Sequence, residues 1–298
     1  MKKLTGLFLL LCVSIGFTAC STRSTNANSQ NDSTPKVYIE NKGSDTIVNL
    51  ALAWAEAYQK LYPSVSISIT GGGTGTGIAA LINNTADIAN ASRQIKEEEI
   101  LNAKNNGVNP YEIVIARDAI AIIINQNNPV DHLTLQQISD IYSGKINNWK
   151  EVGGEDRAIV RLSRESNSGT HVYFLETVLR MGDKNSKLLF DTHTLLLPSS
   201  EGITTEVRDN PNAIGYDGLG YVTPDVKVVG VGVSDEGPFI YPSAETVNQA
   251  VYPISRDLYA YTNGEPTGAL KDYLDWILSS EAQQIVLETG FVPISTTD

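Results

Sequence analysis

The sequence predicts an α/β fold in which short strands alternate with helices and most strands are parallel. Apolar runs such as residues 65–69 have the alternation of a strand, whereas residues 47–61 carry apolar side chains every three or four positions. The second pattern is typical of a helix with one buried face. This alternation extends from Lys36 to the two C-terminal helices, and it indicates the α/β class.

The expected elements follow one another along the chain. Strands are expected at residues 37–39, 65–69, 88–93, 112–125, 159–162, 213–216, 226–233 and 252–262. Helices are expected at residues 47–61, 78–82, 97–103, 135–142, 171–179, 204–208, 269–278 and 281–289. The run at 112–125 is unusually long and apolar, and only Arg117 and Asp118 interrupt it. We expect this strand to cross between two domains.

Composition describes a globular chain and excludes some partners. Of 298 residues, 41% are hydrophobic and 19% are charged, which is enough for one large domain or two smaller ones. The formal net charge of -12 argues against binding nucleic acid through its phosphates. The two cysteines, Cys12 and Cys20, both lie in the first twenty residues, so the rest of the chain cannot form a disulfide or a thiolate metal site.

The N-terminus has the features of an export signal. Lys2 and Lys3 precede an apolar stretch at residues 4–17 that is too short to span a membrane. With Ala19 before Cys20, residues 1–19 resemble a bacterial lipoprotein signal peptide, which implies lipid attachment at Cys20. An ordinary secretory peptide is the alternative, and either places the protein outside the cytoplasmic membrane. Residues 20–35 are polar and are expected to form a lipid-anchored flexible tether.

Three loops combine glycine with serine or threonine, and each follows an expected strand and precedes an expected helix. They are residues 43–46, 71–77 and 166–170. The first N–H groups of a helix lack intrahelical acceptors, and glycine lets an anion approach them. One such loop is more often a simple helix cap. Three in one chain, with Arg164 four residues before Ser168, predict a site for a small oxyanion.

Other kinds of site do not fit the pattern. Residues 71–77 lack the lysine of a nucleotide-binding P-loop, and the Rossmann pattern is unsupported. Ser168 lies near His171, but residues 166–169 do not form a Gly-x-Ser-x-Gly elbow, so we expect no enzyme. His132, His171 and His193 lack metal-ligand spacing. We expect no metal and no cofactor.

The most specific segments match a known family. They are residues 71–78, 86–93, 138–149, 164–170 and 213–216. Over residues 36–295 the chain resembles the phosphate-binding proteins of bacterial ABC phosphate importers, the PstS family. The resemblance implies a type II periplasmic-binding-protein fold with the ligand cleft between two lobes joined by two crossing segments. Lobe I is expected at residues 36–117 plus 236–298 and lobe II at residues 118–235, with the second crossing near Val231–Tyr241.

The resemblance also implies which residues contact phosphate. The expected contacts are Thr46, Ile47, Thr74, Ser92, Arg164, Ser168, Gly169 and Thr170, with Asp45, Gly73, Gly75 and Arg93 as further candidates. Ser92 is a departure, because many family members have an aspartate there that accepts the proton of hydrogen phosphate. Without another carboxylate, discrimination against sulfate is expected to weaken or to depend on Asp45, Glu165 or a backbone carbonyl.

The resemblance thus implies a function in transport. We expect a monomeric, lipid-anchored receptor that captures inorganic phosphate and delivers it to ABC permease subunits. Sulfate, molybdate or tungstate binding on the same fold is one alternative, and a secreted phosphatase or sensor module is another. Once residues 1–19 are removed, the chain has 20 basic and 34 acidic side chains and a net charge of -14.

Overall fold

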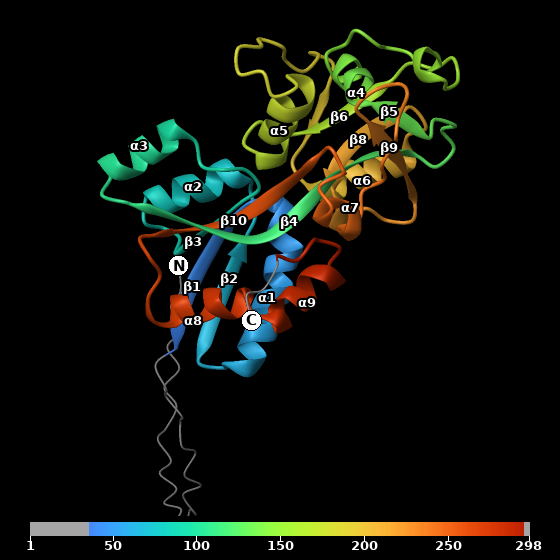
Figure 1. Ribbon diagram of the computed structural model, residues 1–298. Helices are drawn as coiled ribbons and strands as arrows, with labels where there is room; N and C mark the ends of the chain where they lie inside the picture. Colours follow the sequence, from blue (N-terminus) through green and yellow to red (C-terminus); the bar gives the residue numbers. More distant parts are fainter. Residues whose placement is uncertain (1–35, 295–298) are drawn as a thin grey trace, which may run out of the picture. The chain divides into compact units, whose positions relative to one another are not determined.

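The computed structural model describes residues 36–294 (Figure 1). The predicted signal peptide, Cys20 and tether lie outside these residues. Within them, helices and strands alternate as the sequence predicts, and the elements form two lobes connected by two long strands. The connecting strands are β4 (Pro110–Asn125) and β10 (Ser255–Asn263).

The first lobe is a sheet covered by helices on both faces. Its strands are β1 (Val37–Gly43), β2 (Val65–Thr70) and β3 (Ile88–Ala91). One apolar cluster packs α1 (Val48–Leu61), α8 (Gly268–Ile277) and α9 (Ser280–Glu288) against one face. A second cluster packs α2 (Thr74–Ile82) and α3 (Glu97–Asn105) against the other. A short 3-10 helix, η1 (Asp45–Ile47), precedes α1.

The second lobe repeats this arrangement around another set of strands. They are β5 (His132–Thr134), β6 (Val160–Arg164), β7 (Leu195–Leu197), β8 (Ala213–Gly218) and β9 (Val226–Gly232). The helices are α4 (Leu135–Tyr142), α5 (Gly169–Phe174), α6 (Ser200–Asp209) and α7 (Ala244–Asn248). The lobe also contains two short 3-10 helices, η2 (Trp149–Val152) and η4 (Leu219–Tyr221), and a short π-helix, η3 (Leu175–Leu179). Two apolar clusters fill this lobe.

The sheet order is β2-β1-β3-β10-β4-β8-β6-β7, and β9 also pairs with β4. Strand pairs within each lobe are parallel, as predicted, whereas every pair that contains β4 or β10 is antiparallel. The first part of β4 pairs with β10 and its last part pairs with β8 and β9. The long apolar strand therefore passes from one lobe to the other, as the sequence predicts (Figure 1).

The second crossing lies elsewhere than predicted. Val231 and Ile240 form an antiparallel bridge with each other, so residues 231–240 fold back within the second lobe. Val247 and Ile254 also belong to the apolar cluster of that lobe. The prediction of a crossing at Val231–Tyr241 is therefore wrong, because the apolar side chains after it remain packed in the second lobe. We infer a lobe boundary near Ser255, which pairs with Ala119 of β4, rather than at residue 236.

Helix α2 also begins earlier than predicted, at Thr74 inside the glycine-rich segment. The glycines hide the helical pattern, but one of them is needed for packing. A Cβ atom on Gly77 would lie 2.5 Å from Cα of Gly43 and from the carbonyl oxygen of Lys42. Only glycine allows the start of α2 to lie this close to the end of β1.

Candidate functional site

Five hydroxyl side chains from both lobes meet where the three glycine-containing loops come together. We call them the hydroxyl cluster: Ser44, Thr46, Thr74, Ser92 and Thr170. All five are buried. Because the first four come from the first lobe and Thr170 comes from the second, the tertiary fold confirms that loops distant in sequence lie together.

Short hydrogen bonds connect the members of the hydroxyl cluster. The Thr46 and Thr170 hydroxyls lie 2.7 Å apart, across the two lobes. Ser44 Oγ donates to Ser92 Oγ at 2.9 Å, and the Thr74 hydroxyl lies 3.3 Å from Ser92 Oγ. The Ser92 backbone N–H also donates to Thr74 Oγ1 at 3.0 Å. The cluster therefore offers several O–H donors within a small volume, which suits a tetrahedral oxyanion.

Gly169 packs directly against this cluster. A Cβ atom at this position would lie 2.4 Å from Thr74 Oγ1 and 2.5 Å from Ser92 Oγ. The preceding residue, Ser168, caps α5 by accepting from the Thr170 backbone N–H at 3.2 Å. Ser168 thus takes the capping role that we considered for these loops, while Gly169 leaves room beside the hydroxyls.

Arg164 ends strand β6 beside the same loops, and its side chain is buried. Its Nη2 donates to Asp45 Oδ2 of the first lobe at 2.9 Å and to the Pro198 carbonyl at 2.7 Å. Its Nη1 donates to Ser200 Oγ at 2.7 Å. The neighbouring carboxylate, Glu165, is exposed, and Arg164 forms its ion pair with Asp45.

The Ser200 hydroxyl connects Arg164 to a buried carboxyl group. Ser200 Oγ donates to Asp217 Oδ1 at 2.8 Å, and Asp217 Oδ2 has no hydrogen-bond partner. Burial is the main reason that the pKa of Asp217 is raised to about 7; Arg164 opposes this shift, and the charge of Asp118 adds to it. Asp217 therefore changes its charge near neutral pH.

The remaining candidates occupy varied positions. The backbone N–H groups of Ile47, Gly73 and Gly75 donate to the carbonyls of Ser44, Gly43 and Asn167, respectively. Arg93 forms a two-point ion pair with Glu99, with distances of 2.8 and 2.7 Å, and so stabilises the start of α3. Within residues 36–294 it does not hydrogen-bond to the hydroxyl cluster.

The sequence interpretation missed one residue that contacts the hydroxyl cluster directly. Arg256 on β10 is buried and donates to Thr170 Oγ1 at 2.9 Å and to the Ser92 carbonyl at 2.8 Å. Its ion-pair partner is Asp118 on β4, at 2.8 Å. The signal that could have revealed it was Asp118, because a charge within a long apolar strand requires a buried partner.

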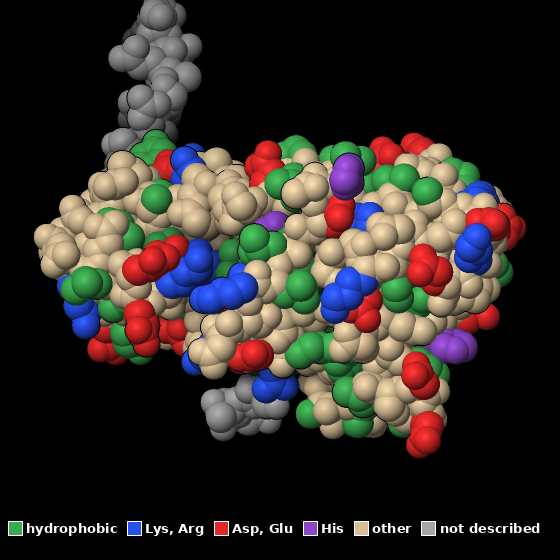
Figure 2. All heavy atoms as spheres, turned by 90° about the horizontal axis from the view of Figure 1, so that it is seen from above, with side chains coloured by type: hydrophobic (Ala, Val, Ile, Leu, Met, Phe, Trp, Pro, Cys, Tyr) green, Lys and Arg blue, Asp and Glu red, His purple; other side chains and the backbone are tan. Residues whose placement is uncertain are grey.

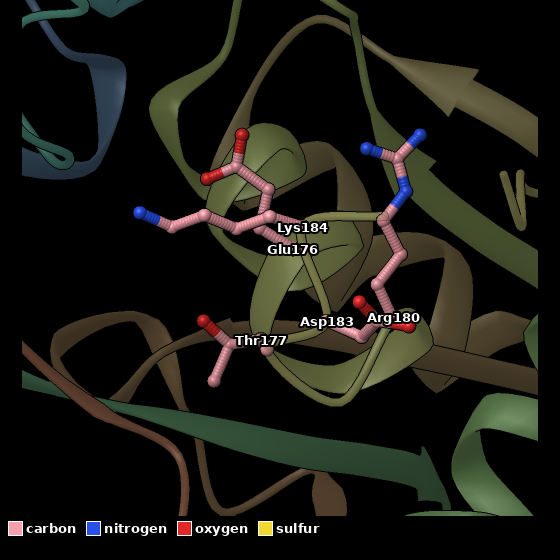
Figure 3. Close-up of a pocket in the computed structure, with 6 residues that line it drawn as sticks. Glu176, Thr177, Arg180, Asp183 and Lys184 are labelled. Atoms are coloured by element: carbon pink, nitrogen blue, oxygen red, sulfur yellow. The ribbon is translucent and has the colours of Figure 1, made fainter. Parts of the chain in front are cut away.

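One pocket away from the hydroxyl cluster is less suited to a small anion. A surface pocket of about 380 Å³ lies beside η3 and contains Glu176, Thr177, Arg180, Asp183 and Lys184 (Figure 3). Its charged groups have both signs, and none of the expected phosphate contacts lines it. Residues 36–294 contain no group of three side chains with the geometry to hold a metal ion.

Comparison with known proteins identifies the family. The profile of the PBP superfamily domain matches residues 27–281. The phosphate-binding protein PstS of Pseudomonas aeruginosa is 33% identical over 273 residues, which cover 86% of this chain and 83% of that protein. The chain belongs to the PstS family. The PstS of Bacillus subtilis is 28% identical over 296 residues, covering 99% of this chain and 93% of the other.

A solved structure agrees with the PstS assignment. A putative phosphate ABC transporter substrate-binding protein from Clostridium perfringens, solved with bound phosphate, is 37% identical with a TM-score of 0.77. The match covers 87% of this chain and all of that one. The two-lobed fold described above is therefore the periplasmic-binding-protein fold of the PstS family, as predicted.

Proposed function

We propose that this protein binds inorganic phosphate between its lobes and delivers it to the membrane subunits of an ABC importer. The observation that carries the proposal is the hydroxyl cluster, which joins loops of both lobes beside the buried Arg164. Oriented hydroxyls and one guanidinium can replace the hydration shell of a small oxyanion. The PstS relatives and the phosphate-bound neighbour from Clostridium perfringens support phosphate as the ligand.

The mechanism is closure of the lobes around the ligand, with no chemical change to it. Thr46 and Thr170 lie on different lobes, as do Asp45 and Arg164, so contacts at the site depend on how the lobes are arranged. An anion that contacts both lobes stabilises the closed arrangement, because it binds that arrangement more tightly than the open one. The two crossing strands, β4 and β10, are the natural place for the hinge.

The chain is a binding protein and not an enzyme. His171 Nδ1 lies 3.0 Å from the hydroxyl of Ser163 rather than that of Ser168, and Ser163 is completely buried. A buried serine that also lies 2.6 Å from the Tyr216 hydroxyl cannot reach a substrate. These contacts argue against the phosphatase alternative.

The acidic composition is compatible with an anionic ligand. Figure 2 shows acidic and basic side chains interspersed on one face of the molecule. Exposed charges farther away than the Debye length of about 8 Å are screened at physiological salt, whereas hydroxyls and Arg164 act at contact distance. The net charge of -12 therefore disfavours polyanions without preventing the capture of phosphate.

The predicted signal at residues 1–19 is the basis for the proposed localisation of the protein. Within residues 36–294, no helix is long and apolar enough to cross a membrane. We infer that the protein acts as a monomer outside the cytoplasmic membrane, where a lipid on Cys20 anchors it. Mass spectrometry of the membrane-associated protein tests this anchor: a diacylglyceryl group on Cys20 is expected, and unmodified soluble protein would contradict it.

Isothermal titration calorimetry tests the ligand. Protein freed of phosphate is expected to bind one phosphate per chain, and Arg164→Ala is expected to abolish high-affinity binding. Arg208→Ala serves as the control, because Arg208 is exposed and its ion pair within residues 36–294 is with its neighbour Asp209. Circular dichroism establishes that the variants fold. Unchanged binding by Arg164→Ala would refute the site, and equal displacement by sulfate would favour the alternative oxyanion.

A further inference from the structure

Arg256 lies at the junction of the two lobes and the two crossing strands. It contacts Ser92 of the first lobe, Thr170 of the second and Asp118 of the other crossing strand. Its guanidinium carbon also lies 5.3 Å from the ring centre of Tyr173. With its side chain only 3% exposed, the guanidinium is held on several sides by the fold.

The contact with Arg256 determines which hydrogen bonds the Thr170 hydroxyl can form. A threonine hydroxyl has one proton and two lone pairs, and Arg256 Nη2 donates to one of the lone pairs. A neighbouring cation repels the hydroxyl proton, so the O–H bond points away from Arg256. The Thr46 hydroxyl, 2.7 Å from Thr170 Oγ1, marks the direction of the remaining hydrogen bonds. Polarisation by a charged donor also strengthens the hydroxyl as a donor.

The geometry points to Arg256 as a specificity-determining positioning residue, which fixes the Thr170 hydroxyl as a hydrogen-bond donor to the bound anion. This inference rests on the proposed function. The selected ligand feature is an ionised oxygen at Thr170, because an ionised oxygen accepts a hydrogen bond from a fixed donor more strongly than a protonated one does. Asp118 holds Arg256 in place through two hydrogen bonds, of 3.2 Å to Nε and 2.8 Å to Nη2.

The same two strands provide a matched control. In the register of β4 and β10, Asp118 faces Arg256, and the next pair is Arg117 with Asp257. The Arg117–Asp257 ion pair has a distance of 3.4 Å, and both side chains are partly exposed. Arg117→Met therefore removes an arginine from an adjacent ion pair without touching the hydroxyl cluster.

A double-mutant cycle with phosphate as the ligand tests the inference. Arg256→Met and Thr170→Val are each expected to weaken phosphate binding about 10- to 100-fold, because each removes the charge-assisted donor. The double variant is expected to bind phosphate no more weakly than the weaker-binding of the two single variants, because both changes remove the same interaction. Arg117→Met is expected to stay within about twofold of the unmodified protein.

The outcomes are distinguishable from failure of the proposed function. If the unmodified protein does not bind phosphate, the function is wrong. Suppose that it binds phosphate but Arg256→Met has no effect, or that the affinity losses of the two single variants multiply in the double variant. Either result overturns only the role of Arg256. Removing Arg256 leaves Asp118 as an unpaired buried charge, which can prevent folding. In that case the pair Asp118→Leu and Arg256→Met replaces both charges. Adding Thr170→Val to this pair is expected to cause no further loss of phosphate affinity.

Discussion

Asp45 and Arg164 form an ion pair across the two lobes, with Oδ2 of Asp45 2.9 Å from Nη2 of Arg164. The same carboxylate oxygen accepts the Ser200 backbone N–H at 3.0 Å. Asp45 is thus the acidic group beside the proposed anion-binding arginine. With a serine at position 92 in place of an aspartate, Asp45 is a candidate to accept the proton of hydrogen phosphate, because a carboxylate only accepts hydrogen bonds.

Asp45→Asn should reduce the preference for phosphate over sulfate. Hydrogen phosphate can donate its proton to a carboxylate, whereas sulfate at neutral pH cannot; an amide can donate to either anion. Competition calorimetry at pH 8 is expected to show the phosphate-to-sulfate affinity ratio falling by about 10-fold. Glu165→Gln is the control, because Glu165 is acidic, adjacent to Arg164 and exposed. An unchanged ratio would exclude Asp45 as the acceptor.

Gly169→Ala should obstruct the hydroxyl cluster. The added methyl group would lie 2.4 Å from Thr74 Oγ1, well inside contact distance. Strain of this kind is typically worth about 1–3 kcal/mol, so phosphate binding is expected to weaken about 10- to 100-fold. Gly202→Ala in α6 is the control, as its nearest neighbour, Ser199 Oγ, would be 3.1 Å away. Equal affinities for phosphate in both variants would show that the ligand lies elsewhere.

Asn167→Ala should accelerate phosphate release. Asn167 Nδ2 donates to the Gly72 carbonyl at 2.9 Å and so connects the third loop to the second across the lobes. Losing one exposed hydrogen bond of the closed arrangement is expected to raise the dissociation rate about 2- to 10-fold. Stopped-flow release measures this rate, and Asn106→Ala on the first-lobe surface is the control. A slower release would contradict the proposed closure.

Asp217→Asn should flatten the dependence of stability on pH. The folded pKa of Asp217 is raised to about 7, so the native state holds a proton that the unfolded chain loses near pH 4. This contribution to the free energy of unfolding is complete below about pH 4 and is lost as pH rises through about 7, by at most about 1.4 kcal/mol per pH unit. Denaturation at pH 5, 6 and 8 measures the effect.

The pH series has a clear expected pattern. Relative to Asp217→Asn, the unmodified protein should lose stability between pH 5 and pH 8, because asparagine does not titrate. Asp235→Asn, which changes an exposed aspartate, is the control and should preserve the pH dependence. Parallel curves for Asp217→Asn and the unmodified protein would show that Asp217 is ionised throughout.

The class of fold, the long crossing strand and the three loops that supply hydroxyls could be predicted from the sequence alone. These features are local: apolar spacing indicates strands and helices, and glycine with serine or threonine indicates helix starts. Arg164 could also be recognised, because it stands at a fixed distance from Ser168 within one segment.

The pairing of buried side chains, in contrast, depends on the tertiary structure. Asp45 with Arg164, Asp118 with Arg256 and Ser200 with Asp217 are pairs formed by separate elements. The second crossing was misplaced for the same reason, since the packing of Val247 and Ile254 depends on the whole second lobe. Spacing along a chain describes the faces of single elements, whereas buried charges are satisfied by neighbours that only the folded sheet brings together.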